Sequence, residues 1–111
     1  MLKPRATQLT RRSAPLFAAL GDPTRLQLVL RLSDCKDCSI SQLADGLAQS
    51  RQGVTKHLKV LENAGLIESR WAGRENRYRF VPQSMGPAQT YLEQVSEQWD
   101  AALLRLRDFV E

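Results

Sequence analysis

Two short helices that follow one another directly constrain the fold of this chain most. Ser39 and Gln42 have the spacing of a capping box, which predicts a helix over residues 40–48. Ser50 can cap a second helix, and Gly65 suits the left-handed position just after its end. With only a tight connection between them, the two helices form a helix-turn-helix pattern.

The second helix has two different faces when it is wound at 100° per residue. Val54, Leu58 and Leu61 fall within one narrow sector, which we expect to face the core. The opposite face and the N-terminal end carry polar and basic residues, namely Arg51, Gln52, Gly53, Thr55, Lys56, Lys59 and Asn63. These residue types read base edges and phosphates in the DNA major groove. Taken alone, however, the pattern is more typical of an ordinary amphipathic surface helix.

A two-stranded hairpin is expected after this helix, over residues 66–71 and 77–81, with the loop AGREN between the strands. Strand alternation predicts that Tyr78 points inward, and that Arg77 and Arg79 point outward. A helix-turn-helix followed by a basic hairpin is the winged-helix arrangement, a mainly α fold of the α+β type. In that arrangement residues 50–64 enter the major groove and residues 66–81 lie along the DNA backbone.

The flanking segments predict helices that pair two copies of the chain. Asp22 and Pro23 start a helix that runs to about Ser33, and an earlier helix covers roughly residues 9–20. The last helix, residues 88–110, has apolar residues in heptad spacing: Ala88, Leu92, Val95, Trp99, Ala102, Leu106 and Phe109. A domain of 111 residues buries only part of its apolar surface, so we predict that this seam, with Leu16, forms a homodimer interface. The alternative is that the stripe packs on the chain's own core.

The charge distribution favours a polyanionic partner. Of the net charge of +4, much lies in two basic segments, a basic N-terminal arm over residues 1–12 and the region 49–81. No apolar run is long enough to span a bilayer, and no secretory signal is apparent, so we expect a single cytoplasmic domain over residues 1–111. With one His and no Gly-rich phosphate loop, the chain does not resemble an enzyme, and no cofactor is expected.

Three stretches in the right order resemble the ArsR/SmtB family of transcriptional repressors: LGDPTRLQLVLRL, ISQLADGLAQSRQGVTKHLKVLENAGLI and RWAGRENRYRF. The resemblance covers about residues 17–81. It implies a homodimer that binds an inverted-repeat operator in double-stranded DNA until a signal releases it. It also implies that recognition-helix contacts come from Arg51, Gln52, Thr55, Lys56 and Lys59, with Arg74 at the wing tip. His57 lies at the edge of that face, where it touches a phosphate or packs locally.

The standard sensor motifs of this family are missing. The thiol-rich sensors of the family resemble one another in a C-x-C motif, and in this chain Ser39 and Ser41 occupy its two cysteine positions. The zinc type and the redox type are also not matched, because the last helix contains no His and no Cys follows Cys38. We therefore predict no metal site of those types. Cys35 and Cys38 leave three readings open: no sensing role, which we favour, reversible oxidation, or a displaced metal site. The sequence identifies neither the inducer nor the operator and its genes.

A winged-helix module that binds other proteins is the main alternative function. Such a module would carry an apolar or acidic outer face on its second helix. The face found here is polar and basic, which favours DNA.

Overall fold

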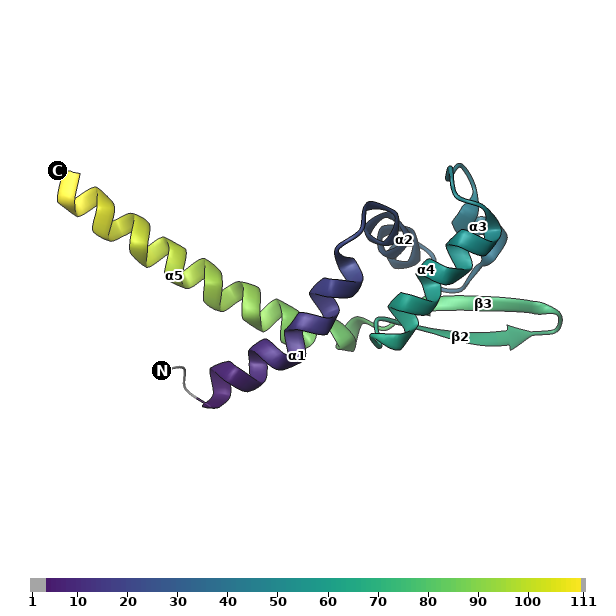
Figure 1. The fold of residues 1–111 in the computed structure, drawn as a ribbon, viewed down its shortest axis with the longest axis horizontal. Coiled ribbons are helices and arrows are strands. Elements are labelled where there is room, and N and C mark those ends of the chain that lie inside the picture. The colour runs from purple at the N-terminus through teal and green to yellow at the C-terminus, as the bar shows by residue number, and fades with distance from the viewer. Residues whose placement is uncertain (1–3, 111) are drawn as a thin grey trace.

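The computed structural model describes residues 4–110, and the side chains of residues 7–110. The chain forms, in order, α1 (Pro4–Leu20), α2 (Pro23–Asp34), β1 (Cys38–Ser39), α3 (Ile40–Ala44), α4 (Arg51–Asn63), β2 (Ile67–Ala72), β3 (Glu75–Phe80), the 3-10 turn η1 (Pro82–Met85) and α5 (Gly86–Val110). Most of the chain is helical, with one small antiparallel sheet in the order β1-β3-β2. The prediction of a helix-turn-helix with a two-stranded wing is confirmed (Figure 1).

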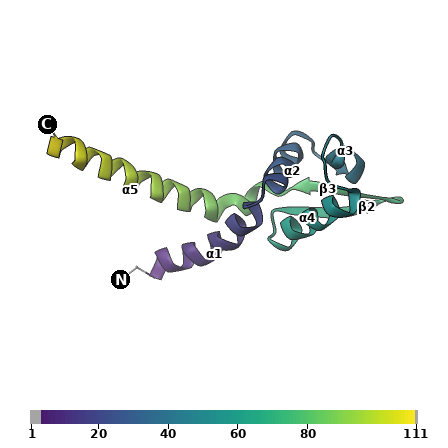
Figure 2. The same ribbon diagram turned by 45° about the horizontal axis from the view of Figure 1, so that its top comes forward.

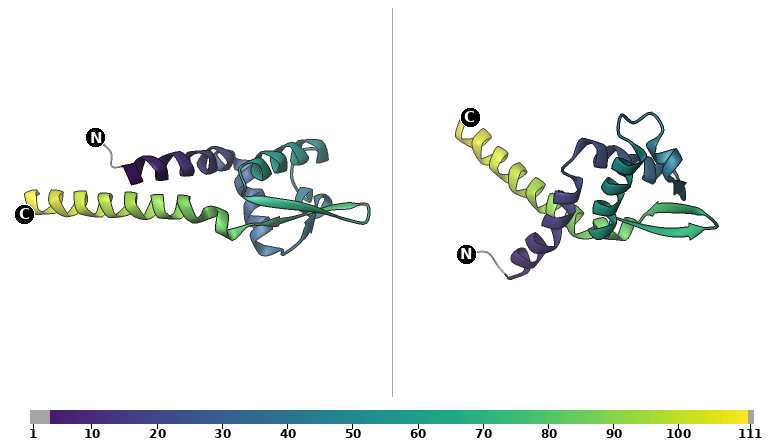
Figure 3. Two further views of the ribbon diagram at one scale, coloured as in Figure 1. Left: turned by 90° about the horizontal axis from the view of Figure 1, so that it is seen from below. Right: turned by 45° about the vertical axis from the view of Figure 1, so that its right-hand side comes forward.

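The molecule is elongated, with principal extents of 63 × 31 × 21 Å. Helices α2, α3 and α4 gather around the base of the sheet, and the β2–β3 hairpin projects away from them at one end (Figure 2). Helices α1 and α5 extend from the other end, where α5 continues well beyond the body of the molecule (Figure 3). None of the described helices has both the length and the continuous apolar composition that a bilayer crossing requires.

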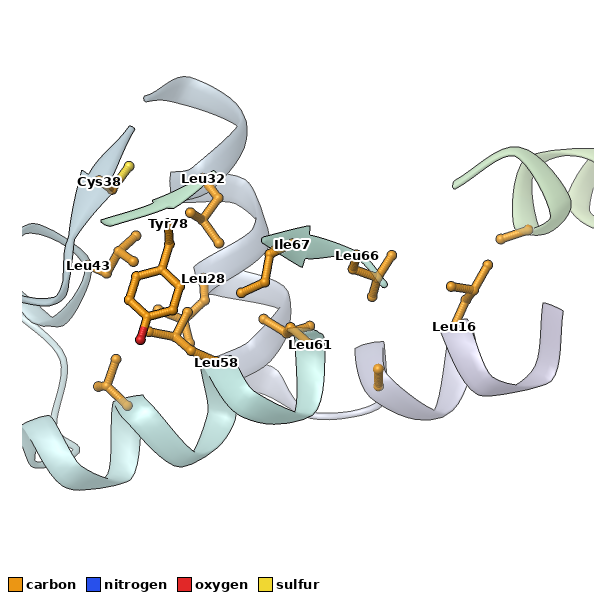
Figure 4. Close-up of a cluster of buried hydrophobic side chains, with 13 residues drawn as sticks. Leu16, Leu28, Leu32, Cys38, Leu43, Leu58, Leu61, Leu66, Ile67 and Tyr78 are labelled. Atoms are coloured by element: carbon orange, nitrogen blue, oxygen red, sulfur yellow. The ribbon is translucent and has the colours of Figure 1, made fainter. Parts of the chain in front are cut away.

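The core lies where α2, α3 and α4 meet the sheet (Figure 4). The predicted inward face of α4 is confirmed, because Val54, Leu58 and Leu61 are fully buried. Tyr78 of β3 also points into this core, as strand alternation predicted. The buried side of α4 thus holds the helix in one rotation, and the polar side is left facing out.

Helix α4 ends in a complete Schellman motif. The N–H of Leu66 donates to the carbonyl of Leu61 (3.1 Å), and the N–H of Gly65 donates to that of Glu62 (2.9 Å). Gly65 has φ +82°, a value that L side chains rarely adopt. Because Leu61 and Leu66 are both fully buried, the motif fixes the angle at which the chain leaves α4 for the wing.

Several predicted boundaries were wrong, each for a local reason. Helix α1 begins at Pro4 rather than near residue 9, so much of the expected basic arm is helical; Pro suits a first helical position. Residues 1–3 of the predicted basic arm lie outside the described part of the chain. Helix α3 ends at Ala44 rather than at residue 48, because the chain reaches Gly46 with φ +76°. Strand β1 was not predicted, since its two residues carry no periodic signal.

Helices α1 and α5 contact each other near the start of α5. Ser13 Oγ donates to the Pro87 carbonyl (3.0 Å), and the rings of Phe17 and Tyr91 meet edge to face with centroids 5.7 Å apart. Leu16 is buried in the chain's own core, which leaves it little surface for the dimer contact predicted for it. This contact holds α5 against the body only over its first turns.

Beyond those turns, the heptad seam of α5 does not pack on the chain's own core. Trp99 is 65% exposed and Phe109 is 88% exposed, while Leu92 and Leu106 are more than half exposed. Val95 and Ala102, on the same stripe, are partly exposed. The structure therefore leaves a long apolar stripe open to solvent, which is unusual for a stable monomer.

Candidate nucleic-acid interface

The outward face of α4 is a continuous polar surface. The predicted contact residues Arg51, Gln52, Thr55, Lys56 and Lys59 are all exposed, and Gly53 is half-buried. Ser50 Oγ accepts a hydrogen bond from the Gly53 N–H (3.1 Å) and so caps the N-terminus of the helix. This exposed face, defined by these five side chains, is called the reading face below.

The side chains of the reading face differ in how they are held. Thr55 Oγ1 donates to the carbonyl of Arg51 (2.8 Å), so its hydroxyl is occupied and its methyl group is presented. Lys59 Nζ lies 3.4 Å from Glu62 Oε1, a solvent-exposed ion pair that contributes little. Lys56 has no acidic partner among the described side chains. It can therefore give its charge to a ligand without first losing a partner.

Contacts from α2 and α3 position the reading face. Arg31 Nη1 donates to the Leu43 carbonyl (2.9 Å) and the Asp45 carbonyl (2.5 Å), where it satisfies groups at the end of α3. In the connection, Gln49 Nε2 donates to Thr24 Oγ1 (2.7 Å). These bonds tie α3 and the connection that leads into α4 to α2. The sequence pattern did not indicate them, because each joins residues that are far apart along the chain.

His57 belongs to a local cluster with α2 rather than to the reading face. Its Nδ1 lies 3.2 Å from Arg25 Nη1 and 3.8 Å from Asp22 Oδ2. The backbone N–H of Arg25 donates to that carboxylate (3.0 Å) and lowers the pKa of Asp22, and the charges of His57 and Arg25 lower it further. Of the two roles expected for His57, the geometry favours local packing.

The wing ends in a tight turn that carries Arg74. Only Gly73 and Arg74 separate the paired residues Ala72 and Glu75, so the loop is shorter than the predicted AGREN. Gly73 has φ +66° and Arg74 does not have a positive φ, the pattern of a type II′ hairpin turn. Arg74 is exposed at this tip and has no acidic partner among the described side chains. It is therefore free to reach beyond the hairpin.

Arg77 lies on the outer side of β3 as predicted, but its guanidinium is paired and only partly exposed. Its Nε donates to Asp37 Oδ2 (3.1 Å), its Nη2 donates to the Asp37 carbonyl (2.8 Å), and Nη1 pairs with Glu75. Arg70 Nη2 also lies 3.1 Å from Asp37 Oδ2. This cluster joins the middle of the wing, at the Arg70–Arg77 pair, to the segment before β1. Its arginines are already neutralised, so Arg77 is a structural residue.

Arg79 is exposed as predicted, but it is paired. Its guanidinium contacts Glu68, the residue directly opposite it on β2. Such an exposed pair is weak and can be exchanged for a phosphate. Arg79 therefore remains available at a small energetic cost.

Trp71 is an exposed aromatic residue on the wing that the sequence interpretation did not single out. It is 68% exposed and pairs with Asn76 near the tip of the hairpin. Strand alternation places it on the same side as Ser69, whose hydroxyl donates to Glu62 of α4 (2.5 Å). Trp71 therefore lies on the α4 side of the wing. A large exposed side chain in a short edge hairpin was the signal that could have found it.

Cys35, just after α2, and Cys38, the first residue of β1, lie side by side. Their Cα atoms are 6.1 Å apart, and the sulfur atoms are within bonding reach. Within the described residues, no group of three His, Cys, Asp or Glu side chains is placed to hold a metal ion. The geometry thus suits a thiol–disulfide pair better than a metal centre.

Comparison with known proteins places this arrangement in context. A family model described as "Helix-turn-helix domain" matches residues 20–70. The arsenical resistance operon repressor of Escherichia coli is 37% identical over 67 residues, which cover 60% of this chain and 57% of that protein. The chain therefore spans little more than half of that repressor.

Two solved structures extend the likeness. An ArsR-like transcriptional regulator from Rhodococcus sp. is 38% identical, with a TM-score of 0.70, and the match covers 91% of this chain and 94% of that one. A homodimeric winged helix-turn-helix DNA-binding domain from Mycobacterium bovis is 20% identical, with a TM-score of 0.64 and coverage of 88% and 90%. At that identity the second structure supports the fold alone.

Proposed function

This chain belongs to the ArsR family of winged helix-turn-helix transcriptional regulators, and we propose that it is a homodimeric repressor that binds an inverted-repeat operator. Its relatives are regulators of transcription, not enzymes. The E. coli relative is a repressor by name, which supports the direction of regulation. We expect the whole unit, residues 1–111, to act through DNA binding without catalysis.

The observation that carries this proposal is the reading face. A core-packed helix presents Gln52, Lys56 and Arg51 on one exposed side, near a capped N-terminus. In the major groove Gln pairs with adenine, and Lys or Arg reaches guanine or a phosphate. The free N–H groups at the start of α4 add a site for a phosphate. Because Gly53 has no Cβ, the backbone of this first turn can come close to that phosphate.

The wing supplies the second contact. Arg74, exposed at the tip and without an acidic partner in the described part of the chain, would reach the minor groove or its phosphates. Trp71 would pack against the sugar–phosphate backbone on the α4 side. Arg79 would exchange Glu68 for a phosphate. We do not include Arg77, whose guanidinium is held by Asp37.

The dimer would form along α5. Its uncovered stripe of Leu92, Val95, Trp99, Ala102, Leu106 and Phe109 has the spacing of a helix–helix seam. A two-fold pair presents two reading faces, which explains why the operator would be an inverted repeat. Half-sites would then lie about one helical turn apart, roughly 10 base pairs. The Mycobacterium bovis domain with this fold is itself homodimeric.

Selection from a random double-stranded DNA pool tests the function directly. The full chain should enrich a two-fold symmetric site and bind it about 10³-fold or more tightly than scrambled DNA. Enrichment of no common sequence, or equal affinity for both DNAs, would contradict the proposal and favour the protein-interaction alternative.

Sedimentation at micromolar concentration tests the seam. Trp99→Asp places a charge in the middle of the stripe and should give a monomer with weakened operator binding. Glu97→Ala, on the opposite side of α5, is the matched control and should remain dimeric. A wild-type chain that sediments as a monomer would remove the dimer from the proposal.

A further inference from the structure

The segment between α2 and β1 is a short strap with a cysteine at each end. Cys35 caps the end of α2, and its N–H donates to the Arg31 carbonyl (3.1 Å). Cys38 begins β1 and pairs with Tyr78 of β3. A Cα separation of 6.1 Å lies within the range that disulfides span. The two thiols can therefore be joined with no movement of the helix or the strand.

The two thiols differ in access. Cys38 is 0% exposed, in the core beside Leu32 and Leu43. Cys35 is half-buried, and it lines a groove of about 600 Å³ between the end of α2 and the base of the wing. Lys36 lines the same groove. A small oxidant can thus reach Cys35, while Cys38 is placed to react only with its neighbour.

The strap also holds the wing. Asp37 lies between the two cysteines, and its carboxylate contacts Arg77 Nε and Arg70 Nη2, each at 3.1 Å. Its backbone carbonyl accepts a third hydrogen bond, from Arg77 Nη2 (2.8 Å). A covalent link from Cys35 to Cys38 would fix Asp37 and with it the middle of the β2–β3 hairpin, where Arg70 pairs with Arg77. Without that link, the strap is held by the short β1 ladder, these polar contacts, the Cys35 N–H bond to Arg31 and the packing of Cys38 in the core.

We propose that Cys35 and Cys38 are a reversible thiol–disulfide pair whose oxidation locks the wing in the position seen here and strengthens DNA binding. The effect on DNA rests on the proposed function; the chemistry of the pair does not.

The oxidant is a peroxide. Cys35 Sγ attacks it, the O–O bond breaks, and water leaves as a Cys35 sulfenic acid forms. Cys38 Sγ then attacks the Cys35 sulfur, the S–O bond breaks, and a second water leaves. Two thiols and one hydrogen peroxide thus give one disulfide and two waters. A dithiol reductant reverses the change by exchange.

The chemistry is tested on the full chain by intact mass after hydrogen peroxide. The wild-type chain should lose the mass of two hydrogen atoms and become resistant to alkylation, and dithiothreitol should restore both thiols. Cys38→Ser should stop at the sulfenic acid, which dimedone traps on Cys35. Cys35→Ser is the matched control and should react far more slowly, because Cys38 is buried. Thiols that stay alkylatable, or a link only between two chains, would overturn the proposal.

The consequence for the wing is tested by hydrogen exchange and DNA affinity. Oxidised wild type should exchange more slowly at residues 35–39 and 75–80 than the reduced form does. It should bind the selected operator about fivefold more tightly, at the low end of typical coupling between sites. The Cys35→Ser/Cys38→Ser variant should respond to neither reagent. Equal exchange and affinity in the two redox states would refute the locking step. If neither state binds DNA, the proposed function fails, while mass and exchange still decide the pair.

Discussion

Helix α4 and the wing both carry several basic residues, yet the structure uses these residues differently. On α4, Lys56 is exposed and has no acidic partner among the described side chains, and Lys59 has a weak one. On the wing, Arg70 and Arg77 share Asp37, and Arg79 pairs with Glu68, which leaves Arg74 at the tip. Equal charge in the sequence thus separates into a surface that can bind an anion and a cluster that holds the fold together.

The difference follows from what lies opposite each element. On the outer face of α4, Arg51 donates a hydrogen bond to Ser41 of α3 (2.8 Å), while Gln52, Thr55 and Lys56 are exposed to solvent or a ligand. The middle of the wing packs against the strap before β1, where Arg70 and Arg77 share the partly exposed carboxylate of Asp37. Position within the fold, and not residue type, therefore decides which cations can contact DNA.

Lys56→Ala should have the largest effect of the charge changes. Its ammonium has no acidic partner within the described residues, so its loss removes a contact from each half-site and releases no carboxylate there. We expect operator affinity to fall by about 1–3 kcal/mol and, if the contact is to phosphate, the salt slope to fall by about one per half-site. Binding titrations at several salt concentrations measure both. An unchanged Kd would break the contrast between α4 and the wing.

Arg74→Ala should have the next largest effect. The turn conformation depends on Gly73 and not on Arg74, so the hairpin should persist and the free energy of unfolding should stay within about 0.5 kcal/mol. Affinity should fall by about 1 kcal/mol on operator and on scrambled DNA alike if the side chain meets phosphate. A loss confined to operators with an A·T-rich flank would place it in the minor groove instead.

Arg77→Ala should act on stability and hardly on DNA contacts. It removes charged hydrogen bonds to Asp37 in a partly buried cluster, and we expect a loss of about 1–2 kcal/mol in the free energy of unfolding. Urea titration measures it. Arg79→Ala is the matched control, because its exposed pair with Glu68 should contribute less than about 0.5 kcal/mol. A stable Arg77→Ala protein that has lost operator binding would reverse our assignment of Arg77.

Local signals in the sequence predicted most of the reading face. The caps at Asp22, Ser39 and Ser50 are all made as expected, because each needs only neighbours three residues away. The core side of α4 followed from its 3.6-residue period. These features are short-range, so one sequence suffices to find them.

Features that join distant segments were not predictable in the same way. Alternation correctly placed Arg77 on the outer side of β3. It could not reveal that Arg77 pairs there with Asp37, which is distant in the sequence. The two-residue strand β1 forms only because β3 offers it an edge. Leu16 looked like part of a seam, but the crossing of α1 over α5 buries it within one chain. In each case tertiary contact decided the role.

The most direct test of the central claim, that the reading face of α4 selects the DNA sequence, is pool selection repeated with Gln52→Ala. Gln52 is exposed on that face, and its amide can pair bidentately with one adenine in each half-site. We predict that the variant selects the same two-fold site with its preference lost at one base-pair position per half-site. When that base pair is substituted, the loss of binding free energy should be about 1–3 kcal/mol smaller for the variant than for the wild type. An unchanged preference at every position, with wild-type affinity, would contradict the account.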